Sequence, residues 1–94
     1  MVHEIIINKR FINKLLSVLN FLEKEWGTKV AQDFVNTVYS RIYALQAHPY
    51  LGSLTSIKNV RGIHITKHNR MFYRIVNNKV VILNLYDTRK KAKK

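Results

Sequence analysis

The apolar residues change their spacing twice along the chain, and the changes divide it into three regions. Near the start, His3-Glu4-Ile5-Ile6-Ile7 contains a β-branched run that predicts a short strand buried on at least one face. From Arg10 onward the apolar residues recur with the spacing of a helix. From Asn59 onward they alternate with polar residues, with the two-residue repeat of a strand. The pattern therefore predicts one strand, a helical region and then a group of strands.

The helical region divides into two helices at a glycine. Asn8 would cap the first helix, Gly27 would end it in the left-handed conformation, and Thr28 would cap the second. The second helix must stop before His48-Pro49, because proline disfavours helical geometry in the residue before it. We expect an antiparallel helical hairpin, followed by a surface loop over residues 50–58. Its apolar faces would be formed by Phe11, Leu15, Val18, Leu22 and Trp26 in the first helix and by Ala31, Phe34, Val35, Val38, Ile42 and Leu45 in the second.

Three strands are predicted after the loop, at residues 59–66, 71–76 and 80–86, and they form an antiparallel meander. Asn77-Asn78 suits a two-residue hairpin turn, because asparagine tolerates the positive φ that such a turn needs at both positions. This turn fixes which residues face each other across the last two strands. On one face it pairs Ile75 with Val80 and Tyr73 with Ile82; on the other it pairs Arg74 with Val81, Phe72 with Leu83 and Arg70 with Leu85.

The two faces of this predicted sheet differ in chemistry. The face with Met71, Tyr73 and Ile75 is apolar and would receive the helices. The other face carries Arg70 and Arg74, around a floor of Phe72, Val81, Leu83 and Leu85. Continued alternation adds Asp87 and Arg89 to this second face, and a turn at His68-Asn69 would add Arg61, Ile63, Ile65 and Lys67. Such a basic face suits a phosphate backbone with bases against the floor, although solvated arginines on an open face are equally common.

Composition and length fit one small globular unit. A chain of 94 residues with 47% hydrophobic residues supports one core, so we expect a single domain over residues 1–94. The chain has no cysteine, which excludes disulfides and thiolate chemistry and fits a reducing cytoplasm. Three consecutive isoleucines are too short for the core of a signal peptide or for a membrane span. We expect a cytoplasmic protein without a membrane partner.

The net charge of +12 is unevenly distributed. Residues 58–94 hold 11 of the 17 Lys and Arg residues and one acid, Asp87. Such a one-sided positive field attracts phosphate backbones, anionic membranes or acidic proteins. The last residues, from Arg89 through Lys90 and Lys91 to Lys94, are expected to be a flexible basic tail that is either simply solvated or binds RNA or an acidic segment.

The sequence lacks the residue patterns that acid/base catalysis, metal binding and nucleotide binding usually require. The five acids are scattered, and Glu23 and Glu25 are two residues apart, so they cannot share a helix face as an acid/base pair. His64 and His68 lack the glutamate of a helical zinc motif. There is no glycine-rich phosphate loop. We therefore expect no metal and no cofactor.

The order of several short motifs resembles the RelE/ParE superfamily of toxins over nearly the whole chain. The motifs are His48-Pro49-Tyr50-Leu51-Gly52, Val60-Arg61-Gly62-Ile63-His64-Ile65, Arg70-Met71-Phe72-Tyr73-Arg74-Ile75, Val80-Val81-Ile82-Leu83 and Asp87-Thr88-Arg89. The resemblance implies a RelE-like α+β fold, with helices on one face of the sheet, and a toxin neutralised by a cognate antitoxin. It also implies one of two activities: RelE-like members cleave mRNA in the ribosomal A site, and ParE-like members inhibit DNA gyrase.

The RelE pattern carries over onto Arg61, Arg70 and Arg89, or onto Lys90 in place of Arg89 if no gap is allowed. The sequence departs from that pattern at Ile63, where the family has a second lysine, and in lacking the C-terminal tyrosine. The remaining residues offer phosphate binding and charge stabilisation but no clear general base. His68, in a turn, is the candidate for that role, because the predicted register points the neighbouring candidate, His64, toward the helices.

Three functions remain open from the sequence. The preferred hypothesis is a ribosome-dependent endoribonuclease acting on ribosome-bound mRNA, with Arg61, Arg70, Arg89 and His68 as catalytic residues and Lys67, Arg74, Lys90 and Lys91 binding RNA. The alternatives are a gyrase inhibitor that binds through the helical hairpin and a non-catalytic RNA-binding module. In either toxin, the antitoxin should cover the basic face, or displace a catalytic residue, with an acidic or amphipathic segment that folds on docking.

Overall fold

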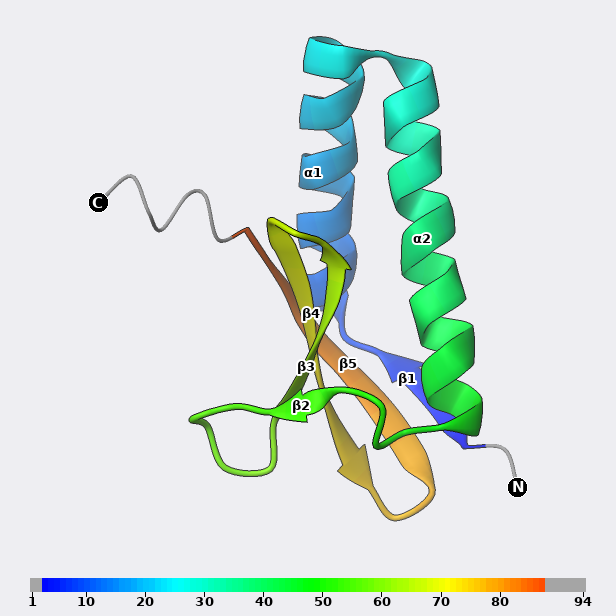
Figure 1. Cartoon of the computed structure of the whole chain (residues 1–94), viewed down its shortest axis with the longest axis vertical. Helices are drawn as coiled ribbons and strands as arrows, with labels where there is room; N and C mark the ends of the chain where they lie inside the picture. Colours follow the sequence, from blue (N-terminus) through cyan, green and yellow to red (C-terminus); the bar gives the residue numbers. More distant parts are fainter. Residues whose placement is uncertain (1–2, 88–94) are drawn as a thin grey trace.

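Two helices pack against a five-stranded sheet in residues 3–87, which are the residues that the computed structural model describes (Figure 1). In chain order the elements are β1 (Glu4–Ile7), α1 (Lys9–Trp26), α2 (Thr28–Ala47), β2 (Ser53–Leu54), β3 (Arg61–Thr66), β4 (Asn69–Val76) and β5 (Lys79–Asp87). The α+β fold class is confirmed, as is the order of first strand, helical hairpin and antiparallel meander. None of the described helices is long and apolar enough to cross a membrane.

The helical hairpin forms where the sequence predicts it, with different caps. Gly27 separates the helices with a φ of 99°, a positive value that favours glycine, but its ψ of 170° lies outside the expected left-handed conformation. Asn8 precedes α1 without a side-chain capping hydrogen bond. Thr28 is the first residue of α2 rather than its cap, and its hydroxyl donates to the Glu23 carboxylate. Helix α2 ends at Ala47, before Pro49, as the proline requires.

The sheet has the strand order β1-β5-β4-β3-β2. Strand β1 pairs with β5 in parallel, which requires a crossover connection, and the helical hairpin provides it. The remaining neighbours pair antiparallel. Strand β2 is a correction to the expected loop over residues 50–58, because its two residues pair with Gly62 and Arg61 at the edge of the sheet.

One layer of apolar side chains lies between the helices and the sheet. The helices contribute Phe11 and, from α2, Phe34, Val38, Ile42 and Leu45, and the strands contribute Ile65, Met71, Tyr73, Val80, Ile82 and Leu85. Trp26, which was expected on the apolar face of the first helix, is 66% exposed instead. Tyr39 and Tyr43 of α2 also face solvent, because they lie beyond the width of the buried helical stripe.

The register of β4 and β5 agrees with the prediction near the turn and departs from it farther away. Ile75 pairs with Val80, Arg74 with Val81 and Tyr73 with Ile82, as Asn77-Asn78 predicts, although only Asn77 of the two has a positive φ. Beyond these pairs a bulge shifts the register. Phe72 therefore faces Asn84 rather than Leu83, and Arg70 faces Tyr86 rather than Leu85. Leu85 joins the core, and Asp87 pairs with Asn69 instead of sharing the face of Arg70.

The turn between β3 and β4 also differs from the prediction. It contains Lys67 and His68 rather than His68 and Asn69, and the pairing shifts between His64 and Thr66. The Thr66 hydroxyl donates to the Asn69 amide oxygen at 2.9 Å and accepts the His68 N–H, so side-chain bonds fix this turn. Because the pairing shifts by one residue between His64 and Thr66, Arg61, Ile63 and Ile65 lie on the face that packs against the core, opposite to the predicted face.

Candidate functional site

Three side chains of β4 point to the face of the sheet that the helices do not cover. Arg70, Phe72 and Arg74 alternate along the strand with the buried residues Asn69, Met71 and Tyr73. Cross-strand pairing adds Tyr86 from β5 and His64 from β3, both opposite Arg70. We call these five residues the open face. The prediction that Arg70 and Arg74 lie away from the helices is therefore correct.

Arg70 is held in a defined position on the open face. Its guanidinium carbon lies 5.3 Å from the centre of the Phe72 ring, and Phe72 in turn packs against Tyr86 with ring centres 6.1 Å apart. Gly62 makes room for Arg70, since a Cβ there would lie 2.5 Å from its Nη2. The Nε atom of Arg70 is buried without a hydrogen-bond partner. The arrangement therefore presents one ordered cation beside two aromatic rings.

Arg61 lies on the other face, which corrects its predicted place beside Arg70. It pairs with Tyr73 of β4, and its Nη1 donates to the Gly52 carbonyl at 2.7 Å. Its guanidinium carbon also lies 4.9 Å from the centre of the Tyr50 ring. Arg61 therefore attaches the loop before β3 to the sheet, and the structure does not bring it together with Arg70.

The remaining predicted residues are only partly described. Lys67 is exposed in the turn between β3 and β4, and His68 is half-buried beside it. Arg74 is exposed on the open face. Arg89, Lys90 and Lys91 lie outside the described residues.

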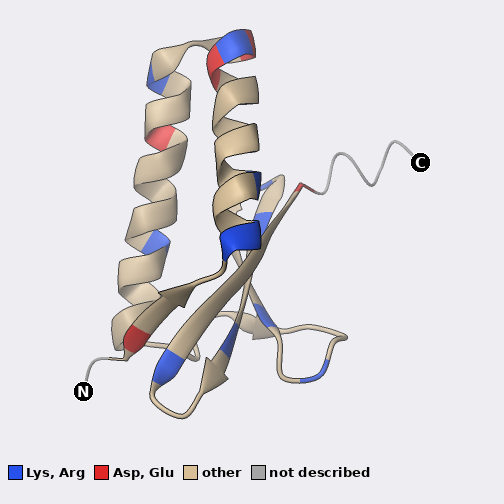
Figure 2. Ribbon diagram, turned by 180° about the vertical axis from the view of Figure 1, so that it is seen from behind, with Lys and Arg blue, Asp and Glu red and all other residues tan. Residues whose placement is uncertain are grey.

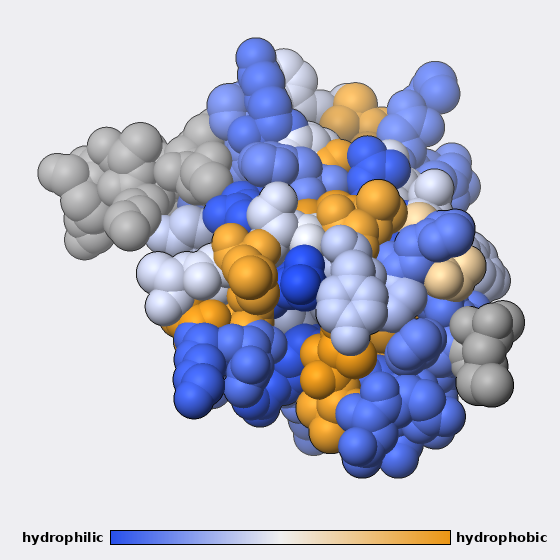
Figure 3. Space-filling view, turned by 60° about the horizontal axis from the view of Figure 1, so that its bottom comes forward, coloured by the Kyte–Doolittle hydropathy of each residue, from blue (hydrophilic) through white to orange (hydrophobic). Residues whose placement is uncertain are grey.

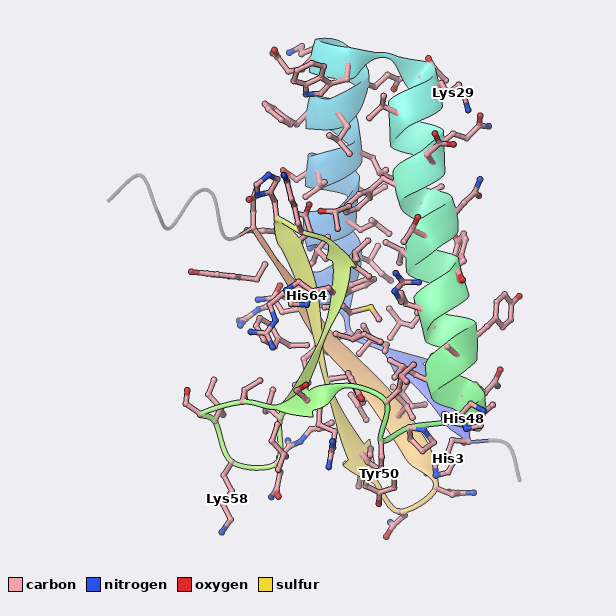
Figure 4. All side chains as sticks on the ribbon, viewed as in Figure 1. His3, Lys29, His48, Tyr50, Lys58 and His64 are labelled. Carbon is pink, nitrogen blue, oxygen red and sulfur yellow. The ribbon has the colours of Figure 1, made fainter. Side chains whose placement is uncertain are left out.

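His64 lies on the open face, whereas the predicted register pointed it toward the helices. It pairs with Arg70 and is exposed, and Figure 4 labels it on the strands. Helix α2 braces the same position from the other side, because Arg41 Nε donates to the His64 carbonyl at 3.0 Å. No local pattern in the sequence indicates the pairing shift between His64 and Thr66 that brings His64 to this face.

Tyr73 connects the core to the loop between α2 and β3. Its side chain is fully buried; its hydroxyl donates to the Pro49 carbonyl at 2.8 Å and accepts the Gly52 N–H at 2.8 Å. Burial raises the pKa of Tyr73 above its ordinary value of 10.0, while the Gly52 hydrogen bond and the charge of Arg61 act in the opposite direction. A Cβ at Gly52 would lie 2.6 Å from the Tyr73 hydroxyl, so this approach requires glycine.

Basic residues are spread over the whole of the described structure. Figure 2 shows Lys and Arg along the strands, at the start of α1, on the loop before β3 and, together with acidic residues, at the tip of the hairpin. A shallow depression between α1 and β5 adds two cations, since it is lined by Arg10, Asn13, Lys14, Ser17 and Asn84. Within residues 3–87, no group of three or more His, Asp or Glu residues could hold a metal ion. The arrangement suits binding to anions or acidic partners.

Comparison with known proteins identifies the family. The sequence matches the family described as the ParE toxin of the type II toxin-antitoxin system, parDE, over residues 5–92. No sequence among the curated proteins is similar enough to extend this comparison.

Solved structures share the fold at low sequence identity. The chromosomal ParDE system from P. aeruginosa gives a TM-score of 0.80 at 15% identity, covering 92% of this chain and 96% of that one. The RelBE2 toxin-antitoxin complex from Mycobacterium tuberculosis gives a TM-score of 0.65 at 14% identity, covering 93% of this chain and 99% of that one. The intact E. coli RelBE toxin-antitoxin complex gives a TM-score of 0.62 at 10% identity, covering 90% of this chain and 95% of that one. These structures share the fold, and the family match over residues 5–92 shows that the chain belongs to the ParE toxin family of type II toxin-antitoxin systems.

Proposed function

We propose that this toxin arrests growth by binding a protein target, DNA gyrase, rather than by cleaving RNA. The observation that carries the proposal is the separation of Arg61 from Arg70 on opposite faces of the sheet. RNA cleavage on the RelE pattern needs both cations at one phosphate, because each would stabilise charge that develops there. In this chain Arg61 is used instead to hold a loop.

Repositioning Arg61 would be unfavourable. Its hydrogen bond to the Gly52 carbonyl and its contact with the Tyr50 ring would both be lost. A charged hydrogen bond of this kind contributes about 1.5–3 kcal/mol and a cation–π contact about 0.5–1 kcal/mol. The side chain would also have to cross to the other face of its strand, which a fixed strand register does not allow.

The comparisons support the same choice. The TM-score is 0.80 with the ParDE system, against 0.65 and 0.62 with the two RelBE complexes. The family match is likewise to the ParE toxin.

We also propose a cognate antitoxin as the second partner. The relatives from M. tuberculosis and E. coli are toxin-antitoxin complexes. The hairpin exposes apolar side chains four residues apart on each helix, Ile12 and Leu16 on α1 and Tyr39 and Tyr43 on α2. An amphipathic segment that folds on docking suits such a surface, and acidic residues in it would complement the basic chain.

A second candidate function, ribosome-dependent mRNA cleavage, is favoured by the open face. His64 lies beside Arg70 and could accept the 2′-hydroxyl proton, while Arg70 stabilises the developing charge. Phe72 and Tyr86 could stack on bases, and Arg74 and Lys67 could contact phosphates. In this candidate, Arg89, Lys90 and Lys91 would add RNA contacts, and no cofactor takes part.

Induced expression in growing bacteria separates the two functions. We expect arrest with a DNA-damage response and unchanged mRNA ends, and we expect Arg70→Ala and His64→Ala to keep full toxicity. These variants leave the core untouched, since both side chains lie on the open face. New mRNA ends within codons, lost in both variants, would instead establish the nuclease.

A further inference from the structure

The loop between α2 and β3 exposes four large apolar side chains within eight residues. They are Tyr50 (67% exposed), Leu51 (56%), Leu54 (67%) and Ile57 (65%), and we call them the apolar loop cluster. The loop projects from the sheet at the end opposite the turn of the helical hairpin (Figure 1). Figure 3 looks onto this end and shows hydrophobic patches at the surface between hydrophilic residues. Large apolar side chains that are exposed together on one loop are typical of interaction sites.

The position of this loop is fixed by hydrogen bonds from both of its ends. The Tyr73 hydroxyl donates to the Pro49 carbonyl and accepts the Gly52 N–H, and Arg61 donates to the Gly52 carbonyl. Farther along, the Thr55 N–H and hydroxyl both donate to the Val60 carbonyl, at 3.0 and 2.9 Å. The apolar side chains are therefore held in solvent by an ordered backbone, so a partner would not need to order them on binding.

Tyr50 of the apolar loop cluster forms a cation–π pair with Arg61 of β3. Leu54 pairs with Arg61 across β2 and β3, and the Arg61 guanidinium lies over the Tyr50 ring. Tyrosine and arginine are enriched among the residues that dominate binding energy at protein interfaces. Lys58 extends from the same loop into solvent (Figure 4).

We propose that the apolar loop cluster is the surface through which the toxin binds its target, a folded protein with an apolar cleft and an acidic rim. This inference rests on the proposed function in one respect, that the target is a protein. A protruding, ordered loop fits a cleft in a folded partner, and Lys58 together with the net charge of +12 favours an acidic rim.

Other occupants fit this surface less well. Nucleic acid requires cations that are free to meet phosphates, whereas Arg61 is engaged by Gly52 and Tyr50. A second copy of the chain would bring another charge of +12 to the contact. The antitoxin segment proposed above would cover the four named apolar residues of the hairpin, which lie on other elements. The open face carries Arg70 and Arg74, so the apolar loop cluster fits an apolar cleft of the target better than the open face does.

The test compares two matched substitutions. Leu54→Ser combined with Ile57→Ser removes apolar area from the cluster, and Trp26→Ser removes an apolar side chain of similar exposure, 66%, from the end of α1. We expect the double variant to lose growth arrest and to inhibit purified gyrase at least about tenfold more weakly, while Trp26→Ser retains both activities. Circular dichroism should show similar melting temperatures, since all three side chains are exposed.

Each possible result decides one claim. Full growth arrest by the folded double variant would overturn the loop inference, as would a wild-type dimer that the double variant abolishes. If the wild type leaves gyrase unaffected but the double variant still loses growth arrest, the loop inference stands and the proposed target is wrong. Should the double variant fail to fold, Lys58→Glu replaces it: weaker arrest supports an acidic partner, and unchanged arrest overturns that partner.

Discussion

Tyr73 joins the core to the loop between α2 and β3 through two hydrogen bonds of its buried hydroxyl. Replacing it with Phe removes the hydroxyl and leaves the Pro49 carbonyl and the Gly52 N–H unpaired. We expect Tyr73→Phe to lower the free energy of unfolding by about 1–3 kcal/mol, because these backbone groups are buried beneath the loop. Urea unfolding of both proteins measures the difference. Tyr39→Phe, at an exposed tyrosine, is the control and should change stability by less than about 0.5 kcal/mol.

The stabilisation from Tyr73 should depend on pH in the alkaline range. Because burial raises its pKa above 10.0, the folded state holds the phenol proton more tightly than the unfolded state does. The contribution is therefore fully present below pH 10 and is lost as the pH rises through 10 toward the raised pKa. The stability difference between wild type and Tyr73→Phe should be constant from pH 7 to 9 and shrink above 10. A difference that grows above pH 10 would contradict the buried-phenol account.

The sequence was informative for some residues of the candidate site and misleading for others. Arg70 and Arg74 were placed correctly because Arg74 lies close to the Asn77-Asn78 turn and both belong to one strand with simple alternation. Arg61 and His64 were assigned to the wrong faces because the pairing of β3 with β4 shifts by one residue between His64 and Thr66. A shift of one residue moves the side chains beyond it to the opposite face of the sheet.

At the level of elements, helices were easier to predict than strand pairing. Gly27 separates the two helices, and Pro49 limits the end of the second. Both effects follow from the backbone preferences of these residue types, which can be predicted from the sequence. The bulge between Phe72 and Tyr73 and the shift between His64 and Thr66 arise from packing across strands, which no local pattern encodes. Strand β2 was missed because two residues give no alternation to detect.

The turn between β3 and β4 depends on Asn69, whose side chain is buried and accepts the Thr66 hydroxyl. Asn69→Ala should lower the free energy of unfolding by about 1–2 kcal/mol, since the Thr66 hydroxyl would lose its buried acceptor. Asn78→Ala is the matched control, because Asn78 is exposed and lacks a positive φ. Chemical denaturation of the two variants gives the comparison. Equal losses would show that the side-chain bond does not determine the turn.

At the scale of the whole molecule, the fold presents three separate surfaces to possible partners. The hairpin offers apolar side chains on two helices, the apolar loop cluster projects from the far end, and the open face carries Arg70 and Arg74 between them. The positive charge extends over the sheet and the loop, so it favours any acidic partner and cannot by itself choose among the surfaces.

Gyrase inhibition by the purified wild-type toxin tests the central claim most directly. The toxin is titrated against a fixed amount of gyrase in a DNA supercoiling assay, with mRNA on stalled ribosomes treated in parallel. A toxin that acts by binding should abolish supercoiling, with inhibition following the occupancy of gyrase, and should leave the mRNA intact. Full supercoiling at toxin in large excess, together with cleaved mRNA on the ribosome, would contradict the account and assign the activity to the open face.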